Sequence, residues 1–179
     1  MKKIVVLTGG TGLVGRCLTN LLLARGYTVR YLSRRKEAIP QVAVFRWDVA
    51  SGFIEEGALA QADYLIHLAG AGIADKRWTP QRKQEILDSR VQSTYLLKEH
   101  IERYGVALKA FVASSAIGYY GGDTGELLHT ELSPAGTDFL AEVTTQWETA
   151  VNRIETLGIR TIKLRTGVVL SRKGEIGRA

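Results

Sequence analysis

The chain has 179 residues, 45% hydrophobic and 23% charged, which is typical of a soluble globular domain that buries a full core. It carries a single cysteine, Cys17, and lacks both a long apolar run and a secretory signal, so we expect a cytoplasmic protein without disulfides or membrane contact. The net charge of +6 is scattered along the chain, which argues against a nucleic-acid partner and favours a small ligand that carries phosphate.

Apolar runs alternate with helical patterns along the chain. A helix is expected to start at Thr79, because Thr79 is a good N-cap and Pro80 suits the first helical position. Six strands are predicted, over residues 3–8, 27–33, 41–48, 62–70, 108–116 and 160–170, with helices over 12–25, 79–104 and 138–157. This alternation predicts an α/β protein with a doubly wound parallel sheet, a Rossmann fold of about six strands with helices on both faces.

The stretch "TGGTGLVGRC", residues 8–17, follows the first predicted strand and is rich in glycine. Gly10 and Gly15 have the spacing of a P-loop. However, Arg16 and Cys17 occupy the positions where a P-loop places the lysine that contacts phosphate and the hydroxyl that holds magnesium. These two replacements argue against a binding site for a nucleoside triphosphate.

A dinucleotide-binding loop is the second interpretation of the same stretch. Gly9, Gly12 and Gly15 lie three residues apart between a predicted strand and a predicted helix. Glycines there allow a tight turn and a close approach of the backbone to a pyrophosphate, and the helix N-terminus faces the phosphates. A glycine-rich turn that binds nothing stays open as the alternative.

The second predicted strand ends without the acidic residue that an NAD site places there to bind the ribose hydroxyl. Ser33, Arg34 and Arg35 stand in its place, and guanidinium groups suit the 2′-phosphate of NADP. A solvated basic turn is the alternative. Asp48, at the end of the third strand, is placed either to accept a hydrogen bond from adenine or to cap a turn.

Several segments together resemble the short-chain dehydrogenase/reductase superfamily, in its extended or atypical branch. They are the glycine loop, "HLAGAGIADKRW", "ILDSRVQSTYLL", "SSAIGYYG", "QWE" and "LRTGVVL". Within that superfamily the chain is similar to the nucleoside-diphosphate-sugar epimerase subfamily, some members of which are labelled cell-division inhibitors. The resemblance covers nearly the whole chain but only the cofactor-binding portion of such proteins. It implies that residues 1–170 form an NADP-binding domain and that 171–179 begin a C-terminal substrate-binding part that is missing.

The resemblance also implies a set of residues that contact NADP(H). The pyrophosphate would lie against Gly9, Thr11, Gly12, Leu13, Val14 and Gly15. The 2′-phosphate would lie against Ser33, Arg34 and Arg35, and the adenine beside Asp48 and Val49. The ribose would lie over Leu68, Ala69 and Gly70, and the nicotinamide near the segment from Thr166 to Val169.

Catalysis in this superfamily uses a serine, a tyrosine and a lysine, the last two in the spacing Tyr-x-x-x-Lys on one helix face. Ser115 matches the serine, but the helix over 138–157 contains neither tyrosine nor lysine. Aligned on Glu148, the pair falls on Leu140 and Thr144, and a shift by one gives Phe139 and Val143. Tyr119 and Tyr120 are alternative proton donors, or they line the pocket as aromatic packing.

Two functional hypotheses follow from the missing pair. In the first, the protein transfers hydride between NADP(H) and a small hydroxyl or carbonyl substrate resembling a nucleotide sugar. In the second, it binds NADPH as a sensor or scaffold without turnover.

Arg90 stands where extended members carry asparagine, and it is a candidate cofactor ligand oriented by Glu85, with a surface salt bridge as the alternative. We expect His67 to be a hydrogen-bonded core residue and Trp78 and Trp147 to be packing anchors. No cluster of ligand side chains predicts a metal site. In related proteins two long helices often pair across a dimer, so the resemblance makes a homodimer a further expectation.

Overall fold

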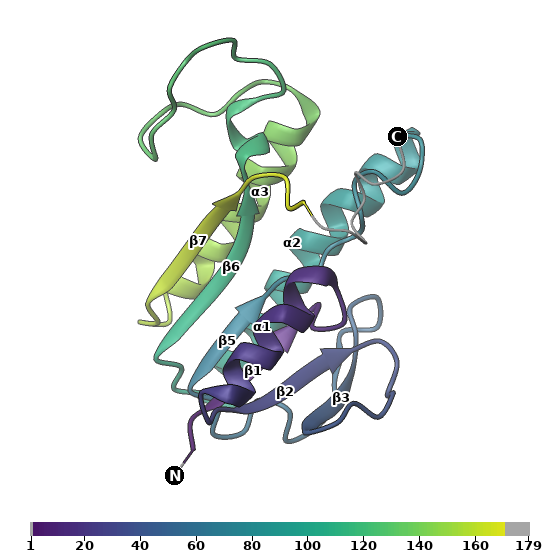
Figure 1. Cartoon of the computed structure of the whole chain (residues 1–179), viewed down its shortest axis with the longest axis vertical. Helices are drawn as coiled ribbons and strands as arrows, with labels where there is room; N and C mark the ends of the chain where they lie inside the picture. Colours follow the sequence, from purple (N-terminus) through teal and green to yellow (C-terminus); the bar gives the residue numbers. More distant parts are fainter. Residues whose placement is uncertain (1, 171–179) are drawn as a thin grey trace.

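The computed structural model of the protein describes residues 2–170. It contains a seven-stranded sheet in the order β4-β3-β2-β1-β5-β6-β7, drawn in Figure 1. The strands are β1 (Ile4–Thr8), β2 (Thr28–Ser33), β3 (Val42–Asp48), β4 (Phe53–Ile54), β5 (Tyr64–His67), β6 (Ala110–Ala116) and β7 (Thr161–Thr166). The predicted α/β class and parallel sheet are thereby confirmed.

One strand, β4, was missing from the prediction of six. It pairs antiparallel with β3, with Trp47 opposite Ile54, whereas every other pairing in the sheet is parallel. The chain reverses between these strands at Gly52, which has a φ of 66°. A strand of two residues is too short to show a hydrophobic period, so sequence patterning cannot detect it.

Three helices cover the two faces of the sheet (Figure 1). On one face, α1 (Leu13–Ala24) packs over β1 and β2, where Val5, Leu7, Val29 and Tyr31 form a buried cluster. On the other face, α2 (Pro80–Arg103) and α3 (Phe139–Glu155) pack against each other and contribute to a larger core. Within residues 2–170, no helix combines the length and apolar character needed to cross a bilayer.

Local sequence signals set the starts of two helices. The hydroxyl of Thr79 accepts a hydrogen bond from the backbone N–H of Arg82, as predicted for an N-cap, and Pro80 occupies the first turn. The carboxylate of Asp138 accepts from the N–H of Ala141 at the start of α3. These caps hold the N-terminal ends of α2 and α3 beside the loops that follow β5 and β6.

The carboxyl ends of the parallel strands lie together at one edge of the sheet, at the top of Figure 1. The glycine loop after β1, the segment after β5 and the short helix η1 (Ile117–Tyr120) after β6 all lie at this edge. In open α/β sheets, ligands bind outside the carboxyl ends of the strands. This edge is therefore where a functional site is expected.

Candidate functional site

The glycine loop is held by contacts that admit no side chain at three of its positions, Gly9, Gly10 and Gly15. Gly9 has a φ of 69°, and a Cβ there would lie 2.8 Å from the carbonyl carbon of Leu68. A Cβ on Gly15 would lie 2.6 Å from the Cα of Gly10 and would overlap the carbonyl oxygen of Gly9. At Gly12 the nearest atom lies 3.3 Å away. Gly15 thus serves the packing of α1 on the glycine loop, and Gly9 serves the packing of the loop on the segment after β5, whereas a Cβ at Gly12 would make a tight contact with the Gly9 carbonyl oxygen.

The N-terminus of α1 is electrostatically suited to an anion. Its N-cap, Gly12, supplies no side-chain hydrogen bond, and the first turn contains no acidic residue. The first amide groups of a helix have no acceptor within the helix, and the helix dipole adds partial positive charge there. Leu13 and Val14 in this turn are 40% and 46% exposed. The loop therefore offers free N–H groups beside an accessible surface.

Buried hydrogen bonds of Thr19 and Tyr31 hold the glycine loop against β2. The ring of Tyr31 on β2 lies directly under Gly10, where any Cβ would overlap it. The hydroxyl of Thr19 donates to the carbonyl of Gly15 at 2.7 Å and lies 2.5 Å from the Tyr31 hydroxyl. Because Thr19 has a single hydroxyl proton, the Tyr31 hydroxyl donates to Thr19. The start of α1 is thus tied to β2.

The end of β2 carries the predicted 2′-phosphate residues on an accessible turn. Ser33 is partly buried and its hydroxyl accepts from the backbone N–H of Arg35 at 3.3 Å. The side chain of Arg35 makes only a long surface pair with Glu37, at 3.9 Å. Arg34 is exposed, and its guanidinium has no hydrogen-bond or ion-pair partner among residues 2–170. The turn presents the guanidinium of Arg34, which makes no ion pair in the described part of the chain. Arg34 lies near enough to Glu85 to contribute to lowering the pKa of that carboxylate, after the ion-pair partner of Glu85 on α2.

Asp48 makes a local contact at the end of β3. One carboxylate oxygen accepts from the backbone N–H of Ala50 at 3.1 Å, and Val49 packs against the larger core. The turn-cap interpretation of Asp48 is therefore confirmed. Contact of Asp48 and Val49 with adenine stays a prediction.

Thr8 and His67 position the segment beneath the predicted ribose site. The hydroxyl oxygen of Thr8 accepts from the backbone N–H groups of Leu68 and Ala69, each at 3.1 Å. With both acceptor positions filled, its proton points to Nδ1 of His67, 2.6 Å away. Nε2 of His67 then carries a proton and donates to Ser93 on α2 at 3.0 Å. Burial lowers the pKa of His67 to about 3, so it is neutral, as predicted for a core histidine.

A cavity of about 320 Å³ opens at the carboxyl edge between β5, β6 and α3. Its walls include the segment 68–73, Arg90, the end of β6 and one face of α3. Leu140 and Thr144, the positions aligned with the tyrosine and lysine, both line this cavity. The Thr144 hydroxyl turns back to the carbonyl of Leu140. Both aligned side chains therefore face the cavity, but neither of them is an acid, a base or a cation.

Ser115 lines the same cavity, but its hydroxyl is engaged in a buried network. It donates to one carboxylate oxygen of Glu148 at 2.6 Å. Arg165 on β7 contacts both oxygens of Glu148, each at 2.8 Å. Burial raises the pKa of Glu148, but hydrogen bonds from Arg165 and Ser115 outweigh burial and hold the pKa below its usual range. The network keeps Glu148 ionised and takes the Ser115 proton.

Tyr119 and Tyr120 lie outside the residues that line the cavity. The Arg165 guanidinium stacks 3.4 Å from the centre of the Tyr119 ring. The Tyr120 hydroxyl accepts from Arg165 at 2.9 Å and donates to the carbonyl of Thr130 at 3.0 Å. Both tyrosines thus pack on Arg165 rather than in the pocket, and proton donation by Tyr119 gains no support.

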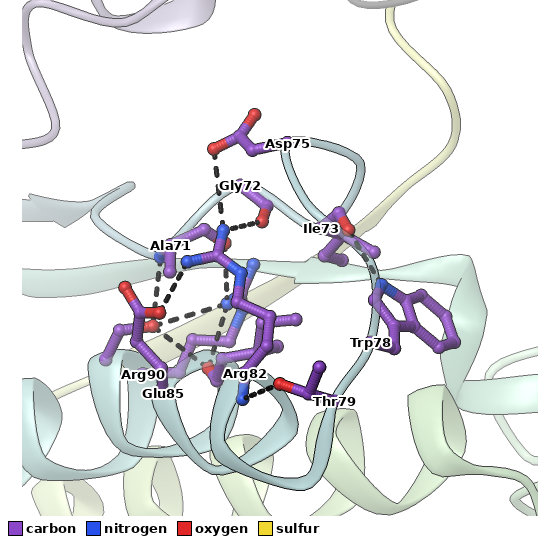
Figure 2. A network of polar contacts seen from close by, with 11 residues as sticks. Ala71, Gly72, Ile73, Asp75, Trp78, Thr79, Arg82, Glu85 and Arg90 are labelled. Atoms are coloured by element: carbon purple, nitrogen blue, oxygen red, sulfur yellow. Dashed lines mark hydrogen bonds and ion pairs between the residues drawn. The ribbon is translucent and has the colours of Figure 1, made fainter.

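The expected orientation of Arg90 by Glu85 is wrong. Glu85 pairs with Arg82 at 2.6 Å, and Arg82 also lies 3.5 Å from Asp75, as Figure 2 shows. Residues five apart point to different sides of a helix, whereas residues three apart share one side. The Arg82–Glu85 spacing was the signal in the sequence that could have identified the true pair.

The surface-pair alternative for Arg90 is wrong as well. Arg90 is partly buried, makes no ion pair within the described part of the chain and lines the cavity. Figure 2 shows it beneath the loop that Arg82 fastens to α2. Glu148 and Arg165 are central to the site and were not predicted, because residues 17 positions apart show no local pattern.

The tryptophans are anchors, as predicted. Trp147 is buried beside His67, and Trp78 is partly exposed but donates from its indole N–H to the carbonyl of Ile73 at 2.8 Å. The Trp78 ring also packs against Phe139 at 5.3 Å. Trp78 thereby attaches the loop at the cavity to α3.

Comparison with known proteins assigns the chain to a family. The model of the NAD dependent epimerase/dehydratase family matches residues 5–174. The chain belongs to this family. It is 37% identical to an epimerase family protein of Mycobacterium bovis and 34% identical to epimerase family protein YfhF of Bacillus subtilis. Each match covers 96% of this chain but 55% and 57% of those relatives, so the chain spans about half of their length.

Solved epimerase structures share the fold. A nucleoside-diphosphate sugar epimerase from Corynebacterium glutamicum has a TM-score of 0.80 and 37% identity, over 97% of this chain and 36% of that chain. Human epimerase family protein SDR39U1, solved with NADPH, has a TM-score of 0.76 and 34% identity, over 97% of this chain and 57% of that chain. These relatives confirm the Rossmann-type architecture and support a nicotinamide cofactor for the epimerase family.

Proposed function

We propose that this chain is the NADP(H)-binding part of an epimerase-like oxidoreductase, whose substrate is a small hydroxyl or carbonyl compound resembling a nucleotide sugar. The bound cofactor supplies hydride transfer. The glycine loop and the N-terminus of α1 hold the pyrophosphate, and Ser33 and Arg34 hold the 2′-phosphate.

The observation that carries this proposal is the exposed Arg34 at the end of β2, whose guanidinium makes no ion pair among residues 2–170. An NAD site would place a carboxylate there, and a guanidinium instead binds a dianionic phosphate through paired hydrogen bonds. The human relative solved with NADPH, at 34% identity, supports the same choice. Gly12 caps α1 without a side-chain hydrogen bond, at the helix end where the pyrophosphate would approach.

The half-length coverage of the relatives supports a second part of the proposal. Residues 1–170 would form the cofactor domain, and a further C-terminal segment would complete the substrate pocket. A homodimer formed through two long helices, which rests on the resemblance, and a cytoplasmic location, which rests on the single cysteine, belong to the same proposal.

A cofactor titration tests the proposal. We expect the full chain to bind NADPH more tightly than NADH, measured by the change in nicotinamide fluorescence. Arg34→Ala should weaken NADPH binding by about tenfold, the value of one charge-assisted contact, and leave NADH binding nearly unchanged.

Arg25→Ala is the matched control, because Arg25 is an exposed arginine at the opposite end of α1. It removes the same charge without touching the cofactor edge. Tighter binding of NADH than of NADPH by the unmodified chain would contradict the assignment of Arg34.

A protein that binds NADPH without turnover is the second candidate function. It is favoured by Leu140 and Thr144 in the cavity and by the Ser115 hydroxyl, which already donates to Glu148. A substrate screen that follows NADPH absorbance separates the two. Turnover that Ser115→Ala abolishes, with the melting temperature retained, would eliminate this candidate.

A further inference from the structure

Three hydroxyl groups on one wall of the cavity share one orientation, because each gives its proton to the protein. Ser115, Thr144 and Thr166 line the cavity from β6, α3 and β7. The Ser115 hydroxyl donates to one carboxylate oxygen of Glu148 at 2.6 Å. The Thr166 hydroxyl donates to the backbone carbonyl of Ser115 at 2.9 Å, and that of Thr144 donates to the carbonyl one turn before it on α3. A hydroxyl has a single proton, so each of these oxygens can only accept a further hydrogen bond.

Ser115 also differs from the buried hydroxyl residues Thr8 and Ser93, whose oxygens accept hydrogen bonds within the protein. The Thr8 oxygen accepts from two backbone N–H groups after β5, and the Ser93 oxygen accepts from His67. The Ser115 residue is only 2% exposed, and among residues 2–170 no group donates to its oxygen. Ser114 lines the cavity too, but as the neighbour of Ser115 on β6 its side chain projects from the other face of the sheet. Buried polar groups usually have partners, so the acceptor positions of Ser115 are available to a ligand.

The Glu148–Arg165 pair fixes the direction of the Ser115 hydrogen bond. Burial raises the pKa of Glu148, but hydrogen bonds from Arg165 and Ser115 hold it below its usual range, so the carboxylate carries no proton. An ionised carboxylate can only accept, and Ser115 is therefore the donor. Arg165 contacts both carboxylate oxygens, each at 2.8 Å, so the carboxylate cannot turn away from Ser115 without losing one of these bonds. The packing of α3 on β6 and β7 thus sets where the Ser115 proton points.

Apolar side chains make up much of the cavity surface near these acceptors. They belong to Leu68, Leu140, Val143 and Trp147. In apolar surroundings, an oxygen that faces another acceptor leaves both without a hydrogen bond, which weakens binding. A ligand hydroxyl opposite Ser115 can donate to it, whereas a carbonyl or ether oxygen cannot. The wall therefore discriminates between ligands by the direction of the hydrogen bond.

We propose that this cavity takes a ligand that presents hydroxyl groups, and not carbonyl or ether oxygens, to the wall formed by Ser115, Thr144 and Thr166. The inference rests on the proposed function and deepens it, because it selects the alcohol form from the hydroxyl and carbonyl compounds considered there. Glu148 is a positioning residue in this proposal, since it does not line the cavity and acts through Ser115.

Two small probes test the proposal in the full chain. Cyclohexanol and cyclohexanone share a six-membered ring, which fits a cavity of about 320 Å³, and differ in whether the oxygen carries a proton to donate. We expect cyclohexanol to bind about tenfold more tightly, measured by saturation-transfer NMR titration, because the ketone leaves an acceptor unpaired. Methoxycyclohexane, whose oxygen has no proton, should bind as weakly as cyclohexanone.

Ser115→Ala removes the acceptor and leaves the rest of the wall in place. The affinities for cyclohexanol and cyclohexanone should then lie within about twofold of each other. Thr149→Ala is the matched control, because Thr149 is an exposed hydroxyl residue of α3 that lies outside the cavity walls and donates to the carbonyl of Thr145. It should keep the full preference for cyclohexanol.

A double variant, Glu148→Leu with Arg165→Met, tests the role of the pair. Replacing both partners of a buried ion pair by apolar residues often preserves stability, so we expect this variant to fold. It leaves Ser115 in place and frees its proton, so cyclohexanone should gain affinity and the preference for cyclohexanol should disappear. A purely structural role of the pair predicts that the preference survives. Lys98→Met with Glu102→Leu, which removes a surface pair on α2, is the control.

NADPH distinguishes two sources of the ligand hydroxyl. If cyclohexanol still binds in the presence of saturating NADPH, the hydroxyl belongs to the substrate. If NADPH displaces cyclohexanol and Ser115→Ala weakens NADPH by at least about fivefold, the hydroxyl belongs to the nicotinamide ribose of the cofactor.

The proposal is overturned if cyclohexanone binds the unmodified chain at least as tightly as cyclohexanol, if neither gives a saturable signal, or if the preference survives in Ser115→Ala. Failure of the proposed function is a different result, in which NADPH does not bind or binds no more tightly than NADH. The ratio of the cyclohexanol and cyclohexanone affinities, measured without cofactor, then still decides which hydrogen-bond direction the cavity accepts.

Discussion

The β1–α1 region and the β6–α3 region occupy the same edge of the sheet but use their polar groups differently. At the start of α1, amide groups are left without partners in the described structure, and beside it, at the end of β2, the Arg34 guanidinium makes no ion pair there. Next to α3, Ser115, Glu148 and Arg165 satisfy one another. The first region has the form of a receptor for an anion, and the second has the form of a structural core.

The largest effect is expected from Gly15→Val in the β1–α1 region. A side chain there overlaps the backbone of Gly9 and Gly10, so α1 and the loop must separate. NADPH affinity should fall by at least about 1,000-fold, equivalent to about 4 kcal/mol, in a fluorescence titration. Gly12→Ala, whose Cβ would lie 3.3 Å from the Gly9 carbonyl oxygen and needs a shift of only a few tenths of an ångström, should lower the melting temperature and weaken NADPH less than Gly15→Val. Equal effects of the two variants would contradict the distinct roles assigned to these glycines.

A smaller effect, on stability alone, is expected from Glu148→Ala in the β6–α3 region. Removing one partner of a buried ion pair leaves Arg165 uncompensated and should lower the free energy of unfolding by about 3 kcal/mol in urea denaturation. NADPH affinity should stay within about twofold of the original value, less than 0.5 kcal/mol. Glu142→Ala, on the exposed side of α3, is the control. A loss of NADPH affinity as large as that of Gly15→Val would erase the contrast between the two regions.

The Glu148 network also predicts acid sensitivity. Because the pKa of Glu148 is lower in the folded chain than in the unfolded chain, its contribution to stability is present above the unfolded pKa. It is lost as pH falls below about 4.

The smallest effect is expected from His67, which is hydrogen-bonded to Thr8 on β1 and to Ser93 on α2. Burial lowers its pKa to about 3, so the unfolded chain binds a proton that the folded chain does not. Stability should therefore decrease as pH falls below about 6.5, by at most about 1.4 kcal/mol between pH 6.5 and pH 5.5. His67→Gln should flatten this slope in urea denaturation between pH 5 and pH 7, a range in which Glu148 stays ionised. An unchanged slope would show that another group causes it.

The sequence predicted those parts of the structure that depend on local patterns. β1, β2 and the three helices follow from apolar periodicity and from caps such as Thr79, which the structure reproduces. β5 and β7 are shorter than predicted, because the small residues after His67 and Gly167 after Thr166 continue the apolar run without pairing in the sheet. Periodicity reports apolar character and not hydrogen bonding between strands.

The parts of the site that the sequence missed depend on contacts between distant residues. The Glu148–Arg165 pair forms only after α3 and β7 pack together. The side of α2 that Arg90 occupies was misjudged because Glu85 was assigned to it as a partner, whereas Glu85 pairs with Arg82. The glycine loop was predictable because strand, turn and helix follow one another directly in the chain.

The buried hydrogen bonds of Thr19 and Tyr31 beneath the glycine loop have a consequence for the kinetics of ligand binding. Tyr31, Thr19 and the carbonyl of Gly15 hold the loop in one conformation from below, through buried hydroxyl groups. Fixing the backbone of a flexible residue costs about 1–2 kcal/mol of conformational entropy. In this loop the backbone is already fixed in the folded chain, before any ligand binds. Ligand association should therefore be a single fast step without a slow ordering phase, and Thr19→Val should add such a phase by freeing the start of α1.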